Sequence, residues 1–93
     1  MFDPRLKYFT PTLSPAAVAA NTTAEQTFTV SGVPLDGMVL AINKPTAQAG
    51  LCIVGARVSA EDTIGITFSN NTGSSITPTA SQVYSVAILV KQP

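Results

Sequence analysis

The chain has 93 residues, which suits one small domain, and a domain of this size buries only about 60–65% of its extended-chain surface on folding. Five basic and five acidic residues cancel, and charged residues make up 11% of the chain, against about 25% in an ordinary domain. Nucleic acids and anionic membranes require clustered Lys and Arg, so neither is expected as a partner. We interpret the weakly charged surface as partly covered by other subunits, and a neutral surface rich in Thr and Ser is the simpler alternative.

The cysteine content and the N-terminal residues bear on localisation. Cys52 is the one cysteine, so no intrachain disulfide can form, whereas small secreted domains usually carry several. The first residues lack the apolar segment of a signal peptide, and the apolar runs are too short to cross a bilayer. We therefore expect a protein made in a cytoplasm, with Cys52 as a small buried side chain on an apolar strand.

Residues 1–13 differ in composition from the rest of the chain. This segment combines aromatic and charged side chains, among them Phe2, Arg5, Lys7, Tyr8 and Phe9. Its prolines favour an extended backbone over a helix. We predict an extended N-terminal arm that packs on a partner, followed by a single β-sandwich domain over residues 14–93. The alternatives are a first strand of the domain or a disordered tail, and the aromatic content disfavours disorder.

The next segments are predicted as strands separated by turn-forming residues. Residues 16–20 are a weak apolar run, too short for a helix, and are expected to form a short edge strand. Residues 26–31 alternate between apolar and polar side chains, which predicts a half-buried strand. Residues 38–42 are continuously apolar, which predicts a central strand covered on both faces.

Two apolar-rich runs, residues 51–58 and 63–69, flank a short polar connection and predict an antiparallel hairpin. In the second run every other side chain is large and apolar, as on a strand with one buried face. In the first run a period of two places Cys52 in one row and Arg57 in the other. Residues 83–90 alternate again and close the domain.

The fold class follows from these periods. No stretch repeats apolar residues at the helical spacing over a useful length, whereas period-two runs recur throughout with turn signals between them. The sequence therefore predicts an all-β fold: a small antiparallel β-sandwich, jelly-roll-like, or a barrel, of about six to seven strands with the extended N-terminal arm.

The residues that usually carry chemistry are missing. The chain has no histidine, the commonest general base and zinc ligand, and one cysteine cannot complete a thiolate zinc site. The acidic residues Asp36, Glu61 and Asp62 fall at predicted turns, where such residues are usually solvated turn formers. No glycine-rich phosphate loop is present. We expect no catalytic residue, no metal site and no cofactor, and a protein that is not an enzyme.

Arg57 is a charged residue on a predicted strand. It is expected either to face outward with its stem on neighbouring side chains or to form an intersubunit ion pair. The acidic partner in the second case would be Asp36, Glu61 or Asp62 of another copy.

Short motifs in the second half of the chain allow a more specific comparison. They are A-R-V-S-A (Ala56–Ala60), D-T-I-G-I-T-F (Asp62–Phe68), N-N-T-G (Asn70–Gly73) and I-T-P-T (Ile76–Thr79), followed by S-Q-V-Y-S-V-A-I. Upstream, A-E-Q-T-F-T-V-S-G (Ala24–Gly32) and N-K-P-T-A-Q-A-G-L (Asn43–Leu51) fit the same pattern. Over residues 21–90 the chain resembles a structural β-module of small tailed-bacteriophage virion proteins, including capsid cement or decoration proteins.

The resemblance implies a capsid cement or decoration protein, a homotrimer on the outer surface of the assembled head that stabilises the capsid lattice. Its partners would be the major capsid protein and further copies of itself, with no nucleic acid and no membrane. It would be located in the virion, on the capsid surface, after synthesis in the host cytoplasm. The alternative within the same resemblance is a tail, collar or fibre-associated virion protein.

Two further expectations complete this interpretation. A small soluble module that binds a sugar or peptide is disfavoured, because two tyrosines and no tryptophan offer little binding platform. Residues 1–13 lie outside the pattern, so their attachment role rests on composition. The residues expected to contact the capsid or another subunit are Phe2, Arg5, Lys7, Tyr8, Phe9 and Arg57.

Overall fold

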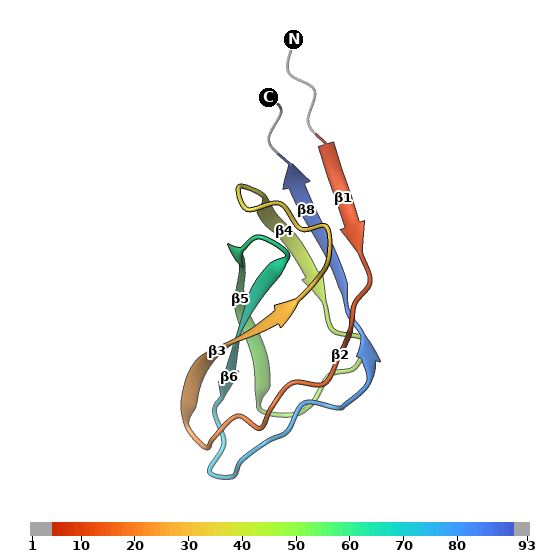
Figure 1. Ribbon diagram of the computed structural model, residues 1–93. Helices are drawn as coiled ribbons and strands as arrows, with labels where there is room; N and C mark the ends of the chain where they lie inside the picture. The colour runs from red at the N-terminus through yellow and green to blue at the C-terminus, as the bar shows by residue number, and fades with distance from the viewer. Residues whose placement is uncertain (1–4, 91–93) are drawn as a thin grey trace.

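A computed structural model describes residues 5–90, which form an all-β domain without a helix, as predicted (Figure 1). The strands are β1 (Arg5–Phe9), β2 (Thr12–Leu13), β3 (Thr22–Thr29), β4 (Met38–Asn43), β5 (Leu51–Ala60), β6 (Thr63–Asn70), β7 (Gln82–Val83) and β8 (Ser85–Val90). Short turns connect most of them, and the turn residues Asn21, Asp62 and Ser81 have positive φ angles.

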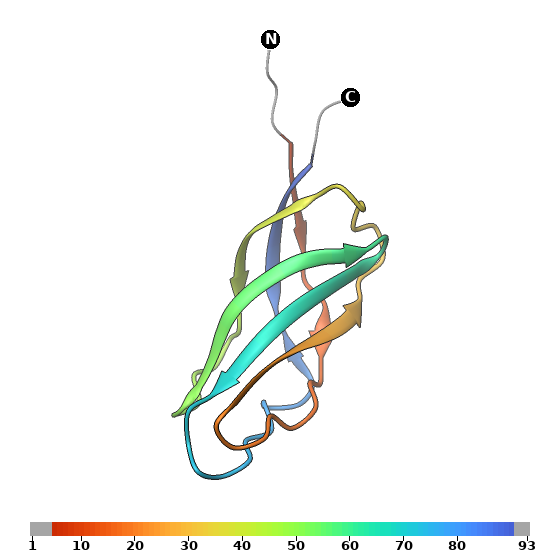
Figure 2. The same ribbon diagram turned by 90° about the vertical axis from the view of Figure 1, so that its left-hand side faces the viewer.

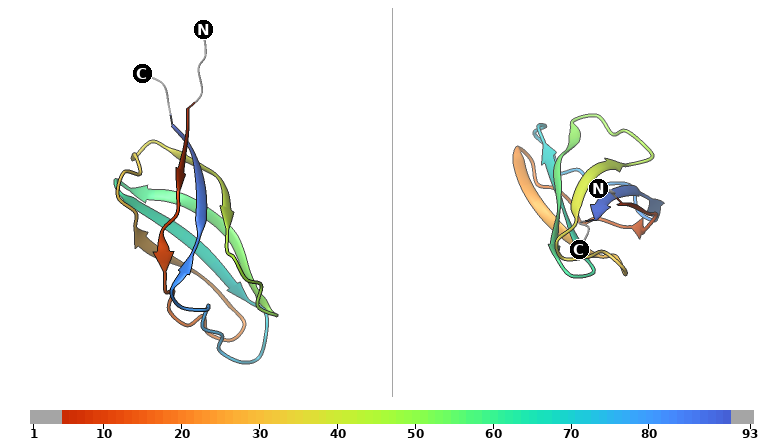
Figure 3. Two further views of the ribbon diagram at one scale, coloured as in Figure 1. Left: turned by 90° about the vertical axis from the view of Figure 1, so that its right-hand side faces the viewer. Right: turned by 90° about the horizontal axis from the view of Figure 1, so that it is seen from above.

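The strands form a sandwich of two antiparallel sheets. One sheet has the order β1-β8-β4 and the other β3-β6-β5, while β2 pairs with β7 beside them. Figure 3 shows the two sheets as facing layers when the domain is viewed from above. Within residues 5–90 no pairing joins the two large sheets into one cylinder, so of the predicted alternatives the sandwich describes the fold.

The described part of the predicted N-terminal arm belongs to the sandwich. Arg5–Phe9 pairs with β8 in a continuous antiparallel register, and Thr12–Leu13 pairs with β7. Leu13 is buried in the core and Phe9 packs against it, which fixes this extended segment inside the domain. The boundary at residue 13 is therefore wrong for residues 5–13, and their alternative as a first strand is correct. Phe2, also assigned to the arm, lies outside the described residues.

The predicted hairpin is present as β5 and β6, but the register of its first strand shifts at two places, Val54 and Ser59, and the first shift changes the expected faces. The register shifts between Ile53 and Gly55, so Val54 has no partner on β6. A bulge moves every following side chain to the other face relative to strict alternation. Cys52 consequently lies on the same outer face as Arg57 and is exposed, and the prediction of a buried Cys52 is wrong.

Two other predicted strands differ from the structure. In the 16–20 run only Val18 makes a strand-like contact, a single bridge to Ile76, because its exposed alanines have little side chain to pack. The 38–42 run is β4, but β4 lies at an edge of its sheet, with Met38 60% and Leu40 51% exposed. A continuous apolar run fits a covered central strand and an edge strand with an apolar outer face equally well.

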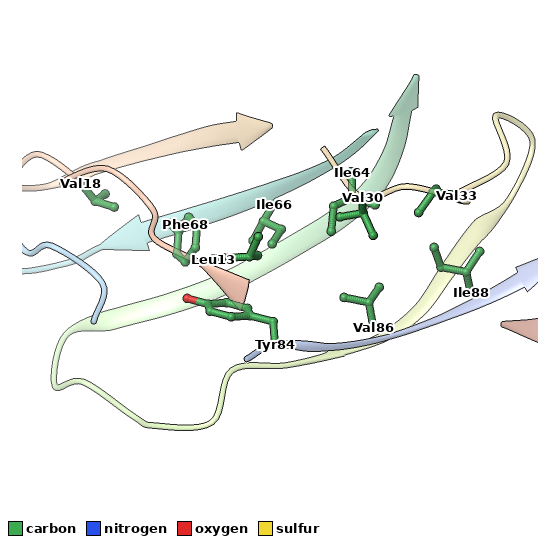
Figure 4. Packing of buried hydrophobic residues seen from close by; sticks show 10 residues of the cluster. All are labelled: Leu13, Val18, Val30, Val33, Ile64, Ile66, Phe68, Tyr84, Val86 and Ile88. Carbon is green, nitrogen blue, oxygen red and sulfur yellow. The ribbon is translucent and has the colours of Figure 1, made fainter. Parts of the chain in front are cut away.

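The core lies between the two sheets (Figure 4). One sheet contributes Ile64, Ile66 and Phe68 of β6, and the other contributes Val86 and Ile88 of β8, all at most 1% exposed. Tyr84, just before β8, is fully buried beside them. Leu13 of β2 and three side chains of connecting segments complete the cluster: Val18, Val30 and Val33. The period-two patterns of residues 63–69 and 83–90 predicted these inward rows.

Asn70 is the one buried polar side chain among the described residues. Its amide nitrogen donates to the carbonyl oxygens of Val18 at 3.0 Å and Ser74 at 2.8 Å. Its Oδ1 accepts from Thr72, from the amide at 2.9 Å and from the hydroxyl at 2.8 Å. Because its full hydrogen-bonding capacity is used, Asn70 can stay buried while it fixes the N-N-T-G turn to the Val18 segment.

Candidate interaction surface

The outer face of the sheet β1-β8-β4 is apolar across its three strands, which lie toward the viewer in the left panel of Figure 3. The side chains of β8 that alternate with its buried residues point outward. Leu89 and Ala87 have a partner on each neighbouring strand, and Ser85 has one on β4. The resulting rows are Leu6–Leu89–Met38, Tyr8–Ala87–Ala41 and Ser85–Asn43. We refer to the six residues of the first two rows as the apolar face, and the polar pair Ser85–Asn43 borders it.

Three of the large side chains of the apolar face are exposed to solvent, and Leu89, between Leu6 and Met38, is partly buried. Leu6 is 65%, Tyr8 70% and Met38 60% exposed, and no charged side chain of the described residues shares these rows. An open hollow lies on this side, lined by Tyr8, Ala41, Ile42, Asn43, Ser85 and Ala87. Contiguous exposed apolar patches mark sites of interaction on soluble proteins more often than isolated apolar residues do.

The outer face of the other sheet, β3-β6-β5, has a different chemistry; Figure 2 views the molecule from this side. Its rows are Thr29–Thr63–Ala60, Thr27–Gly65–Arg57, Glu25–Thr67–Gly55 and Thr23–Ser69–Cys52, and we refer to these residues as the polar face. Hydroxyl groups predominate, and Thr23 Oγ1 donates to Ser69 Oγ at 3.1 Å. Such a face is suited to contact with water.

A bidentate ion pair crosses the polar face. Arg57 Nε donates to Glu25 Oε2 at 2.8 Å, and Arg57 Nη2 donates to Glu25 Oε1 at 2.9 Å. Gly65, on the strand between them, leaves room for this pair, because a Cβ there would collide with the Glu25 carboxylate. The hydrogen bonds from Arg57 lower the pKa of Glu25, and the same bonds raise the pKa of Arg57.

Arg57 thus faces outward, which was the first of the two alternatives predicted for it, and it pairs with Glu25 of its own chain. The acidic partner expected from the sequence was Asp36, Glu61 or Asp62 of another copy, and Glu25 was not among the candidates. The two residues lie 32 positions apart, and only the pairing of β3 and β5 with β6 brings them together. A contact of Arg57 with another subunit stays a prediction.

The other predicted contact residues lie on β1 and divide between its two sides. Tyr8 belongs to the apolar face, whereas Arg5 and Lys7 lie on the opposite side of the strand and are exposed. Phe9 is half-buried, and its ring lies against Gly32. Tyr8 is exposed, and its predicted contact with the capsid or another subunit stays a prediction. Its neighbours Leu6, Met38 and Leu89 were not among the predicted contact residues. The signal for them was the apolar character of the non-core row on β8.

Among the acidic turn residues, Asp62 forms hydrogen bonds that connect two loops. Asp62 Oδ1 accepts from the amide of Gly32 at 2.8 Å, and the Asp62 amide donates to the Val33 carbonyl oxygen at 2.8 Å. This exposed residue therefore ties the β5–β6 turn to the loop after β3. Over residues 5–90, no three His, Cys, Asp or Glu side chains group closely enough to hold a metal ion.

Helices of the length and hydrophobicity needed to cross a membrane do not occur in the described part of the chain. Comparison of the chain with protein-family models, with curated proteins and with solved structures found no match. The resemblance to phage virion modules therefore stays a prediction drawn from the motifs quoted above. The site of greatest functional interest in residues 5–90 is the apolar face.

Proposed function

We propose that this chain is a capsid cement or decoration protein of a tailed bacteriophage, which binds the outer surface of the assembled head. The apolar face is the observation that supports this proposal most directly. A small sandwich with one apolar and one polar outer face can lie on a protein lattice by the first and present the second to water. The motifs over residues 21–90 support a phage head as the particle, and the difference between the two faces supports this orientation on its surface.

The proposed mechanism is thermodynamic, with no catalytic step and no cofactor. A subunit that binds the assembled lattice, but not free major capsid protein, shifts the equilibrium toward the lattice by mass action. At a free concentration of one hundred times Kd, each occupied site stabilises the bound state by about 2.7 kcal/mol. Many such sites over the outer surface of a head would raise its resistance to heat and pressure.

A homotrimer fits this mechanism. Each apolar side chain removed from water contributes about 1.5–3 kcal/mol, and Leu6, Tyr8 and Met38 are already partly covered, so one copy offers only modest binding. Association also carries an entropic cost that one small face offsets poorly. Three linked copies bind with higher avidity because the second and third contacts form at a high effective concentration.

The decisive experiment removes the protein from purified particles and measures its rebinding. We expect saturable rebinding to heads, with a copy number comparable to that of the major capsid protein by gel densitometry. A low copy number, with the protein retained on isolated tails, would instead support a tail, collar or fibre component. Absence from the particle would contradict both.

The oligomeric state is tested separately by multi-angle light scattering on the purified chain. A trimer mass at micromolar concentration is the expected result. A monomer mass in solution, with binding to heads intact, would contradict the trimer and leave the proposed function standing.

A further inference from the structure

The free edge of β1 is the second unoccupied surface on the same sheet. Among the described residues β1 has one strand neighbour, β8, so half of its main-chain groups have no strand partner. Its register with β8 is continuous from Arg5 to Phe9, which leaves the edge straight. The edge strands β4 and β5 instead carry bulges, at Leu40 and Val54, and bulges hinder the addition of a further strand.

The fourth edge strand, β3, also has a continuous register, but its side chains offer an added strand fewer selective contacts. Its outward side chains are mainly threonines, and its one charged residue, Glu25, is already paired with Arg57. β1 is therefore the edge with both a regular backbone and side chains that can select a partner.

The side chains of β1 alternate between two kinds of chemistry. Leu6 and Tyr8 project into the apolar face, whereas Arg5 and Lys7 lie on the other side and are exposed. Neither basic residue forms an ion pair with a residue in the 5–90 range. A strand laid against this edge would thus meet apolar side chains on one side and two positive charges on the other.

A second copy of the chain fits this edge poorly. If two β1 strands paired antiparallel over all five residues with their apolar sides together, Lys7 would face Lys7 of the second copy, and a shift by one pair in one direction would place it opposite Arg5. Like charges directly opposite on neighbouring strands are destabilising, and basic residues on edge strands act against self-pairing. The partner must therefore carry the opposite charge pattern.

We propose that β1 accepts an extended segment of a partner protein in which acidic residues alternate with apolar residues, added as an antiparallel strand. The acidic side chains face Arg5 and Lys7, and the apolar side chains pack beside Leu6 and Tyr8 and extend the apolar face. Main-chain hydrogen bonds provide affinity and the alternation provides specificity, as in other cases of strand addition. The inference rests on the proposed function only in expecting such a segment in the major capsid protein.

The test uses the isotope-labelled full chain and a soluble probe. The probe is a hexapeptide of alternating glutamate and valine with acetylated and amidated ends, and its control has lysine in place of glutamate. We expect the acidic peptide to bind at least about tenfold more tightly than the basic one, because cross-strand charge pairs reverse from attractive to repulsive. Chemical-shift changes should lie on β1 and β8, with slower amide exchange at β1.

Matched variants separate a specific site from net charge. Arg5→Glu/Lys7→Glu should invert the preference between the two peptides, since both residues are exposed and their replacement leaves the core intact. Thr27→Glu/Thr29→Glu adds negative charge to the polar face and should leave the preference unchanged. An acidic peptide with N-methylated backbone amides should not bind, because it cannot form the ladder of hydrogen bonds.

Three results would overturn the inference. They are the absence of binding at millimolar peptide, equal binding of both peptides, and shift changes on a surface other than β1. Any of them combined with normal rebinding to stripped heads would refute strand addition and leave the proposed function intact. Peptide binding without rebinding to heads would support strand addition at β1 and contradict the proposed function.

Discussion

The two sheets of the sandwich are alike inside and different outside. Each has three antiparallel strands, and each buries a row of large apolar side chains against the other. On the outside, the sheet β3-β6-β5 carries threonines and the Arg57–Glu25 ion pair, while the sheet β1-β8-β4 carries Leu6, Tyr8 and Met38. The first sheet shows that this fold tolerates a polar outer face. The apolar residues of the second are therefore better explained by contact with a partner than by folding.

Hydrogen bonding supports the same distinction. Polar-face side chains interact with one another, as Thr23 does with Ser69 and Arg57 with Glu25. Leu6, Tyr8 and Met38 of the apolar face have only their lateral neighbours on the sheet, and most of their surface remains in water. The following predictions test whether substitutions on the apolar face affect binding while substitutions elsewhere affect only stability.

The largest expected effect comes from the double substitution Leu6→Thr/Met38→Thr on the apolar face. Threonine keeps the strands, so the free energy of unfolding should change by less than about 1 kcal/mol. Lost burial of the two side chains should weaken binding to stripped heads by about 100-fold or more, because about 1.5–3 kcal/mol each gives about 3–6 kcal/mol in all and each 1.4 kcal/mol is tenfold. Thr27→Ala/Thr29→Ala is the matched control, and equal loss of binding in both variants would contradict a special role for the apolar face.

Asn70→Ala should have the largest effect on stability. The substitution removes the amide nitrogen that donates to Val18 and Ser74 and the single oxygen that accepts both hydrogen bonds from Thr72. Loss of this buried network should lower the free energy of unfolding by about 2–3 kcal/mol in a denaturant titration. The folded fraction should bind heads as the wild type does, and a specific binding defect would show that this end of the sandwich takes part in attachment.

Tyr84→Phe is expected to stabilise the protein by about 1 kcal/mol, because the buried Tyr84 hydroxyl has no hydrogen-bond partner. Burial also raises the pKa of Tyr84 above 10.0. Since the folded pKa exceeds the unfolded one, wild-type stability is full below pH 10.0 and falls as the pH rises further. Denaturant titrations at increasing alkaline pH should show this fall in the wild type and a smaller fall in the variant. An unchanged or lower stability would indicate that the hydroxyl is satisfied.

Glu25→Gln should produce the smallest effect, because the ion pair with Arg57 is exposed and screened by solvent. The folded pKa of Glu25 is lowered from 4.5, so its contribution is present above pH 4.5 and is lost as the pH falls through the folded pKa. A series of Tm measurements should show a shallower acid-side decline in the variant. Binding to heads should not change, and a binding defect would place the polar face in the interface.

Much of the fold could be predicted because strand periodicity is a local property. The inward rows of β6 and β8 appear in the sequence as strict alternation, and the hairpin appears as two such runs around a polar turn. The bulge at Val54 could not be predicted, because nothing in an apolar run marks which of its residues is left without a partner on the next strand. That single residue explains why Cys52 was wrongly expected in the core.

The candidate surface was less predictable because it is assembled across strands. Leu6, Leu89 and Met38 come from the two ends and the middle of the chain, and only the strand order β1-β8-β4 aligns them. The ion pair of Arg57 with Glu25 likewise depends on two strands flanking β6. The apolar outer row of β8 was visible in the sequence, but its neighbours were not.

The central claim is that the apolar face is covered in the assembled particle while the polar face stays in contact with water. Thiol labelling measures this directly, because the native Cys52 lies on the polar face and is exposed. A Met38→Cys/Cys52→Ser variant places one thiol on the apolar face instead. On bound heads relative to free protein, we predict an unchanged labelling rate for the wild type and at least about tenfold protection in the variant. Protection of Cys52 with free labelling of the variant would contradict the account.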